Sequence, residues 1–406
     1  MQEVPCVSYR DLDKKQTPDG EHGLMPRLTN RTECIMLNPI KREEAEMEQV
    51  FLVGTYTEPI LFGTGDVFRG KGEGVYLCAL HGTEMETVAV LPAVNPSFVC
   101  ADEERRRLYA VHETKEWEGR FGGGVSQWRY DGDGTFTLEE TRGTGGTDPC
   151  HLSVSPDGRW LAVANYSSGA LTAFALDAQG CISSAGRVFQ HTGSSVNRAR
   201  QEGPHAHGAI FGPDGLLYVP DLGMDRVMCY RCGDGEDGIQ PCGEQTLIAA
   251  PGSGPRYAEF SPDGNHLYII HELASEVTHY IRTNRGMEHR ETVSTLPSGF
   301  AGESIGADLH LTPDGRYLYA SNRGHDSLAM FRVEPDGSLA SLGWQPCGGR
   351  TPRNFAVSPE GGLLLVGNQD TDNITAFAIG KDGRLRQTGD YPFPTPVCIR
   401  FLRKWR

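Results

Sequence analysis

Apolar and polar residues alternate in short runs along most of this chain, and tight turns separate paired runs. The clearest pair begins at His151 and reads HLSVSPDGRWLAVAN. Alternation with a period of two is typical of a strand that buries one face. Pro presets φ at the first turn position, and Gly accepts the positive φ that follows. The pattern therefore predicts a β-hairpin at this position.

The same hairpin pattern recurs at intervals of about 50 residues, which is a repeat length typical of β-propeller blades. The further copies are HGAIFGPDGLLYVPD from His207, RYAEFSPDGNHLYIIHE from Arg256, ADLHLTPDGRYLYASNR from Ala307, RNFAVSPEGGLLLVGNQ from Arg353 and a degenerate SFVCADEERRRLYAVHE from Ser97.

We therefore predict an all-β fold, a seven-bladed β-propeller of four-stranded antiparallel blades, over residues 48–406. The strand VFLVGTY from Val50 and the strand TPVCIRFL from Thr395 each lack a hairpin partner of their own. Pairing them closes the ring and removes its open edges. Residues 1–47 are polar and show no strand alternation, so we expect an N-terminal extension whose order the sequence does not fix.

Composition narrows the range of partners and compartments. Lys and Arg number 38 against 53 Asp and Glu, and the formal net charge of −15 excludes a generally basic nucleic-acid binder. No apolar run is long enough to span a membrane, and the N-terminus lacks the apolar core of a signal peptide. The 11 scattered cysteines then predict reduced thiols in the cytoplasm. The oligomeric state is left open.

Hairpin geometry predicts that polar residues from all repeats meet at one end of the central channel. The residue that opens the first strand and the residue that ends the second lie at the same end. Charged and imidazole groups are rarely buried unless they are paired or bind something, so this end is a candidate ligand site. Structural ion pairs at a solvated mouth are the alternative. The openers are His151, His207, Arg256, Asp308 and Arg353, and the closers are Glu113, Asn165, Asp221, Glu272, Asn322, Arg323 and Gln369.

One connection, HTGSSVNRARQEGPHAH at 191–207, carries candidate binding groups without a strand pattern. Arg200 suits an anionic substrate, because its planar guanidinium grips carboxylate or phosphate with two hydrogen bonds. Gln201 and His205 are further candidates for substrate binding. His205 and His207 offer two metal ligands, but no third ligand matches them, so we predict no metal site.

An ordered set of motifs resembles the seven-bladed lactonase propeller family, which includes bacterial 6-phosphogluconolactonase and fungal carboxymuconate-lactonizing enzyme. The resemblance covers about Val50 to Phe401 and implies cofactor-free chemistry on a lactone or its open hydroxy acid. The motifs are VGTYT at 53–57, DPCHLSVSPDG at 148–158, ARQEGPHAH at 199–207, GPRYAEFSPDG at 254–264, SNRGHDS at 321–327 and TPVC at 395–398.

The resemblance also implies which residues act. The family's functional positions fall on His151, Arg200, His207, Glu272 and Arg323. The family has Asn-Glu-Leu where this chain has His271-Glu272-Leu273, and this imidazole raises a question about the local pKa and the substrate preference.

Lactone hydrolysis requires a base for the water, an oxyanion stabiliser and an acid for the leaving hydroxyl. We expect Glu272 to be the base, with His151 or His207 as base or acid alternatives. An ion pair of Glu272 with Arg256 or Arg323 is its structural alternative. Arg200 and Arg323 would bind the anionic group and the developing oxyanion, and the expected substrate contacts are His205, Arg256, Gln201, Asn322 and Glu113, of which Glu113 is also a second acid candidate.

The leading substrate is 6-phosphogluconolactone, in the oxidative pentose phosphate route, because its phosphate fits an arginine-rich site. Two alternatives stay open. One is a cycloisomerase or a lactonase for an unphosphorylated or muconate-type lactone on the same scaffold. The other is a non-enzymatic binding propeller, because fold alone does not decide function.

Overall fold

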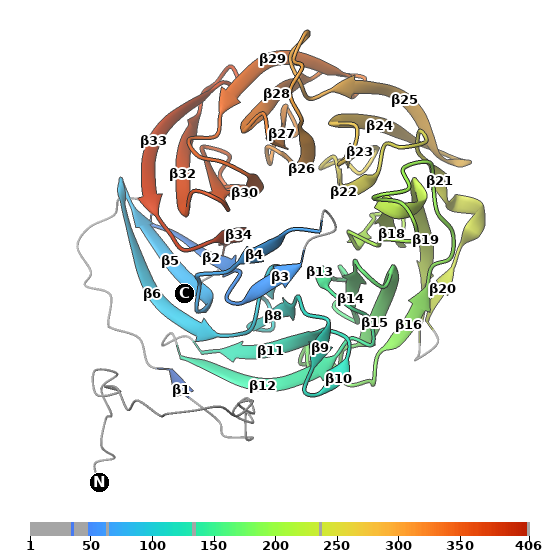
Figure 1. Ribbon diagram of the computed structural model, residues 1–406, viewed down its shortest axis with the longest axis vertical. Coiled ribbons are helices and arrows are strands. Elements are labelled where there is room, and N and C mark those ends of the chain that lie inside the picture. Colours follow the sequence, from blue (N-terminus) through green and yellow to red (C-terminus); the bar gives the residue numbers. More distant parts are fainter. Residues whose placement is uncertain (1–33, 36–47, 62–64, 132–134, 235–237, 404–406) are drawn as a thin grey trace, which may run out of the picture. The chain divides into compact units, whose positions relative to one another are not determined.

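Seven antiparallel sheets stand around a common axis in the computed structural model (Figure 1). It describes residues 34–35, 48–61, 65–131, 135–234 and 238–403, which belong to one compact unit, Glu33–Arg406. The predicted seven-bladed propeller is confirmed. Of the expected extension 1–47, only Cys34–Ile35 is described, and as β1 it pairs with β12 of the second blade. The rest of that segment lies outside the described residues.

Each blade has four main strands, which are named below in order from the channel outward. Blade 1 is β34 (Pro396–Leu402), β2 (Gln49–Thr55), β5 (Gly74–His81) and β6 (Glu84–Pro92); blade 2 is β7 (Val99–Asp102), β8 (Arg107–His112), β11 (Gly124–Tyr130) and β12 (Phe136–Gly143). Blade 3 is β13 (Pro149–Val154), β14 (Trp160–Asn165), β15 (Ala170–Ala175) and β16 (Arg187–Gln190); blade 4 is β17 (Ile210–Phe211), β18 (Leu216–Asp221), β19 (Arg226–Cys232) and β20 (Ile239–Pro241), with β21 (Leu247–Ile248) also on β19.

The last three blades follow the same plan. Blade 5 is β22 (Pro255–Phe260), β23 (His266–His271), β24 (Glu276–Thr283) and β25 (Gly286–Ser294); blade 6 is β26 (Ile305–Leu311), β27 (Tyr317–Arg323), β28 (Ser327–Val333) and β29 (Leu339–Pro346); blade 7 is β30 (Pro352–Val357), β31 (Leu363–Asn368), β32 (Asn373–Ile379) and β33 (Leu385–Pro392). Two small hairpins, β3 (Pro59–Leu61) with β4 (Val67–Arg69) and β9 (Glu116–Trp117) with β10 (Arg120–Phe121), extend the loops of blades 1 and 2.

The two ends of the propeller meet in blade 1. Strand β34, the last of the chain, pairs antiparallel with β2, and Val53 lies opposite Ile399. Figure 1 shows β34 as the strand nearest the channel in a blade whose other strands come from the start of the propeller. The predicted pairing of VFLVGTY with TPVCIRFL is confirmed, and it closes the ring of blades.

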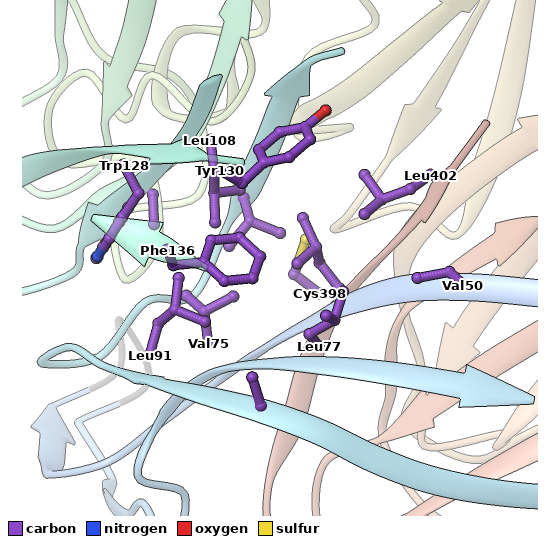
Figure 2. Close-up of a cluster of buried hydrophobic side chains, with 14 of the residues drawn as sticks. Val50, Val75, Leu77, Leu91, Leu108, Trp128, Tyr130, Phe136, Cys398 and Leu402 are labelled. Atoms are coloured by element: carbon purple, nitrogen blue, oxygen red, sulfur yellow. The ribbon is translucent and has the colours of Figure 1, made fainter. Parts of the chain in front are cut away.

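Apolar side chains fill the space between neighbouring blades. Alternate residues of β2 point to opposite neighbours: Leu52 belongs to the cluster shared with blade 2, and Phe51 and Val53 belong to the cluster shared with blade 7. Figure 2 shows the first cluster, in which Val75 and Leu91 of blade 1 lie beside Phe136 of blade 2. Successive side chains of a strand point to opposite faces. Both faces of β2 pack against a neighbouring blade, so both of them are apolar.

Aspartates before the third strand tie three blades to the blade that follows. Asp225, Asp326 and Asp372 have φ values of 52°, 51° and 51°, a conformation that Asp tolerates better than most residues. Each carboxylate accepts the backbone N–H of the residue just before the next inner strand, at 2.7 to 3.0 Å. These contacts fix where the next blade starts relative to the channel; their donors are Gly254, Thr351 and Thr395.

Replacement of Asp225 tests this inter-blade contact. Asp225 is buried and accepts backbone N–H groups of Gly252 and Gly254 at 2.6 and 2.7 Å. Asp225→Asn keeps the shape but removes the charge and one acceptor, so we expect a loss of about 1–3 kcal/mol in the free energy of unfolding. Denaturant unfolding measures it. Asp382→Asn, in an exposed turn, is the matched control and should stay within about 0.5 kcal/mol; equal losses would refute the role of Asp225.

Candidate active site

A β-bulge opens the inner strand at the same end of several blades. In blade 3, Pro149 pairs with Asn165 and His151 pairs with Ala164, so Cys150 has no partner. A bulge of this kind turns a side chain in a new direction, and in this propeller the extra residue faces the channel. The residues left unpaired in the same way are Arg256 in blade 5, Arg353 in blade 7 and Val397 in blade 1.

A second set of channel residues lies directly after the second strand or, for Arg323 in β27, at its last position. The residue before each of them is buried and polar, and in blade 5 it bonds within its own blade, where His271 Nε2 lies 2.8 Å from Thr278 Oγ1. The next residue points the other way, because successive side chains alternate. In five blades it lines one common cavity: Glu113, Tyr166, Glu272, Arg323 and Gln369.

The cavity measures about 510 Å³ and lies at the channel mouth where these two sets meet. Its floor holds Glu113, Cys150, His207 and Arg353, which also line a narrow neck of about 20 Å³ below it. Its rim carries apolar residues of the β3–β4 hairpin and several carboxylates. These rim residues are Leu61, Val67, Phe68, Asp66, Glu303 and Asp370.

Glu272 is surrounded by three guanidinium groups. Its Oε1 accepts from Arg200 at 2.6 Å, and its Oε2 accepts from Arg323 at 2.7 Å and from Arg256 at 3.0 Å. Burial alone would raise the pKa of Glu272, but the guanidinium groups, Arg323 first, outweigh it and hold the pKa well below its usual range. Glu272 is therefore ionised and strongly held on both oxygens.

Two of these arginines have an N–H donor that makes no hydrogen bond to the described residues. The Nε atoms of Arg200 and Arg323 are buried and have no hydrogen-bond partner among the described residues. Burial lowers the pKa of Arg323 to about 10, with the carboxylate of Glu272 working against that decrease. Arg323 thus stays charged at neutral pH. Buried donors without partners are costly, and an anionic ligand would satisfy them.

The loop 191–207 brings Arg200 to the cavity through a buried network. His191 Nδ1 lies 2.6 Å from Asp221 Oδ2, and the other oxygen of Asp221 accepts the backbone N–H of His205 at 2.8 Å. Gln201 donates to the carbonyl of Leu222 at 2.9 Å. Gln201 and His205 therefore hold the loop and do not line the cavity, contrary to their expected contact with substrate.

The other predicted residues lie in three places: in the cavity, in the neck below it, and away from both. Glu113, Arg200, His207, Glu272 and Arg323 line the cavity. His151 and Arg256 lie in the neck below, where His151 packs between Phe98 and Tyr257 and its Nδ1 accepts the N–H of Ala209. Asn322 donates to the carbonyl of Thr295 at 2.8 Å and does not line the cavity, whereas the next residue, Arg323, does.

The imidazoles of His207 and His310 differ in charge: the first is neutral and the second is positive. Burial, reinforced by the Arg256 guanidinium, holds the pKa of His207 well below its usual value, so the ring is neutral at neutral pH. Burial also opposes charge on His310, but the carboxylates of Asp308 and Glu259 outweigh it and raise the pKa to about 10. His271 bonds inside its blade and does not line the cavity, so its imidazole does not contact a ligand there.

Arg353 was expected at the channel end but not as a substrate contact, and Tyr56, which lies behind the cavity wall, was not expected at the site. The Arg353 guanidinium lies 5.4 Å from the centre of the Tyr56 ring, and both approach Glu113. The sequence carries the signal for Arg353: GPRYAEF and TPRNFAV align, so Arg353 occupies the position of Arg256. Tyr56 directly follows the strand that ends in VGT, just as Glu272 directly follows the strand that ends in IIH. This shared position is the sequence signal for Tyr56.

Known proteins share this sequence and architecture. Residues 50–401 match the family described as "Lactonase, 7-bladed beta-propeller". The chain belongs to this family. The 6-phosphogluconolactonase of Bacillus subtilis is 33% identical to this lactonase propeller over 312 residues, 75% of this chain and 83% of that protein. The 6-phosphogluconolactonase of Formosa agariphila is 32% identical over 270 residues, 65% of this chain and 75% of its own.

A solved structure supports the same assignment. The periplasmic gluconolactonase of Pseudomonas aeruginosa superposes on the lactonase propeller with a TM-score of 0.79 and 30% identity, covering 88% of this chain and 99% of that one. Within the described ranges, no helix is long and apolar enough to cross a membrane. The same ranges hold no group of three or more His, Cys, Asp or Glu placed to share a metal ion, and their nine cysteines are free thiols.

An NMR titration of selectively ¹⁵N-labelled histidine checks the two charge states. At pH 7 we expect His310 to be protonated and His207 to be neutral, because their pKa values move in opposite directions. His207 should remain neutral as the pH falls through the usual imidazole pKa, whereas His310 should lose its proton only as the pH rises toward about 10. His207→Asn and His310→Asn assign the signals, and a common transition near the usual imidazole pKa would contradict this electrostatic description.

Proposed function

We propose that this lactonase propeller hydrolyses an anionic sugar lactone, with 6-phosphogluconolactone as substrate and 6-phosphogluconate as product. The observation that carries the proposal is the group of guanidiniums around two buried glutamates: Arg200, Arg256 and Arg323 pair with Glu272, and Arg353 approaches Glu113. Two relatives named 6-phosphogluconolactonase support it.

Charge and donor geometry favour a phosphorylated ligand. The four guanidiniums exceed Glu113 and Glu272 by two positive charges, which a phosphate dianion would balance. The carboxylates of Asp66, Asp148, Glu303 and Asp370 also line the cavity and act against this excess. The side chains of Arg200 and Arg323 are 16% and 12% exposed, so the ligand meets them largely out of water. Charge-assisted hydrogen bonds are stronger there than at a solvated surface. We assign the phosphate to Arg200 and Arg323, whose Nε donors have no partner among the described residues.

The remaining cavity groups suit the sugar and the lactone. Gln369 offers a buried Oε1 that accepts no hydrogen bond within the described residues, and it would accept from a sugar hydroxyl. Arg353, on the floor beside Glu113, would stabilise the oxyanion that forms when water attacks the carbonyl carbon. Of the two histidines predicted as proton carriers, His207 is the one that lines the cavity, and His151 lies in the neck.

The reaction would belong to the oxidative pentose phosphate route in the cytoplasm. The free thiols of the nine described cysteines support a reducing compartment. A second candidate substrate is unphosphorylated gluconolactone. The rim carboxylates Asp66, Glu303 and Asp370 favour it, because they oppose entry of a dianion, and the structural relative named gluconolactonase supports it too.

Hydrolysis assays with phosphorylated and unphosphorylated gluconolactone test the proposal. We expect faster hydrolysis of the phosphorylated lactone, and Arg200→Gln should raise KM for that substrate about tenfold to a hundredfold, because one charge-assisted contact is worth about 1.5–3 kcal/mol. KM for the unphosphorylated lactone should change little. Arg332→Gln, which removes an exposed arginine paired with Glu334, is the control. Equal wild-type rates on both lactones would remove the phosphate assignment and leave gluconolactone as substrate.

A further inference from the structure

The cavity contains two glutamates at equivalent repeat positions with different surroundings. Glu113 follows β8 in blade 2, and Glu272 follows β23 in blade 5. Both side chains are nearly buried, with exposed fractions of 7% and 4%. Glu272 receives three charge-assisted hydrogen bonds from arginines, and its two oxygens are both engaged. Two carboxylates in contrasting environments at one site often divide the tasks of a reaction between them.

Glu113 has a weaker set of partners. The phenol of Tyr56 donates to its Oε2 at 3.1 Å, and the nearest guanidinium nitrogen, on Arg353, is 3.9 Å from Oε1. The other titratable groups that act on it are the carboxylate of Asp148 and the thiol of Cys150, both from blade 3. Glu113 therefore faces one phenol, one guanidinium, one carboxylate and one thiol.

These surroundings change the acidity of the carboxyl in the direction that base catalysis needs. Burial raises the pKa of Glu113, and Asp148 adds to that increase, whereas Arg353, Ser97 and Tyr56 offset only part of it. A base works best when its pKa lies near the working pH. A carboxylate whose pKa is held far below that pH, as in Glu272, accepts a proton poorly.

Glu113 is also placed where water and a lactone carbonyl can meet. It lines both the cavity and the neck, and Arg353 and His207 border both spaces with it. A water molecule beside Glu113 would therefore lie on the floor, at the far side of the ring of blades from Glu272. With the phosphate on Arg200 and Arg323 near Glu272, the lactone end of the substrate would extend toward Glu113.

We infer that Glu113 is the catalytic base of the lactone hydrolysis and that Glu272 is a positioning residue that orients the substrate-binding arginines. This inference rests on the proposed function. Glu113 takes a proton from water as the water oxygen bonds to the carbonyl carbon, and the carbonyl oxygen becomes an oxyanion beside Arg353. The bond from that carbon to the ring oxygen then breaks, its electron pair stays on the ring oxygen, and Glu113 returns the proton there to form the hydroxyl.

Tyr56 is a positioning residue in this scheme. Its phenol holds Oε2 of Glu113, which leaves the other oxygen to face the water. Its side chain is fully buried in the closing blade, and its own pKa is raised well above the usual value by burial, so it donates the hydrogen bond and carries no charge. Tyr56→Phe should lower kcat with little change in KM and should shift the pH profile, a combination that a purely structural role would not give.

The decisive experiment compares kcat as a function of pH for the wild type, Glu113→Gln and Glu272→Gln. The wild type should lose activity as the pH falls and Glu113 becomes protonated. Glu113→Gln should lower kcat about a hundredfold or more and abolish that acidic limb. Glu272→Gln should keep the limb and mainly raise KM for the phosphorylated lactone. Glu360→Gln, in an exposed turn at the opposite end of blade 7, controls for loss of one carboxylate.

The outcomes separate this inference from the proposed function. If the wild type hydrolyses lactones but Glu113→Gln keeps the wild-type kcat and acidic limb, Glu113 is not the base and the lactonase assignment stands. If the wild type hydrolyses no lactone, the proposed function falls and this inference with it. A ¹³C titration of the glutamate carboxyls, assigned with the same variants, is independent of turnover: a Glu113 pKa at or below that of Glu272 would overturn the inference.

Discussion

The cavity depends on one backbone feature, the β-bulge that opens the inner strands. The residue before the bulge has a positive φ in several blades, with values of 52° at Asp148, 59° at Thr351 and 40° at Thr395. Such conformations cost of the order of 1–3 kcal/mol for residues other than glycine and persist only when the surrounding structure holds them. Aspartates from preceding blades hold two of these residues by accepting their N–H groups. The bulge can then direct Arg256 and Arg353 toward the channel and away from the apolar blade boundary.

The arginine cluster shows how the fold tolerates several buried charges at one place. An unpaired buried charge is strongly destabilising, and removal of one partner of a buried pair costs about 3–5 kcal/mol. Glu272 shares its two oxygens among three guanidiniums that arrive from a loop, a bulge and a strand end. The charge of Glu272 limits the repulsion between these three guanidiniums and keeps them in place for an anion. The same saturation makes Glu272 a poor proton acceptor, which is why its equivalent in blade 2 takes that task.

Much of the fold follows from the repeated hairpin, because Pro-Asp-Gly turns and alternating runs specify the two inner strands of each blade without reference to distant contacts. The common end of the channel follows from the same geometry. The repeated hairpin does not determine which side chains reach the cavity. Asn322 and Arg323 are adjacent, and only the register of β27 decides which of them faces the cavity. Arg353 carries the same local pattern as Arg256, and the alignment of the repeats placed it at the channel end without assigning it a contact with substrate. The three partners of Glu272 come from separate parts of the chain, and no local pattern reveals that all of them reach one carboxylate.

The order in which strands contribute to blade 1 has a consequence for biosynthesis. Strands β2, β5 and β6 leave the ribosome first, but their inner neighbour β34 spans Pro396–Leu402, more than 300 residues later in the chain. Contacts over such separations carry a large loop-closure entropy and form late. Until β34 has been translated, the nascent chain must keep an unpaired strand edge and an apolar face of its first sheet exposed. The closing blade, and with it the complete ring around the pocket, can therefore form only after β34 has emerged from the ribosome.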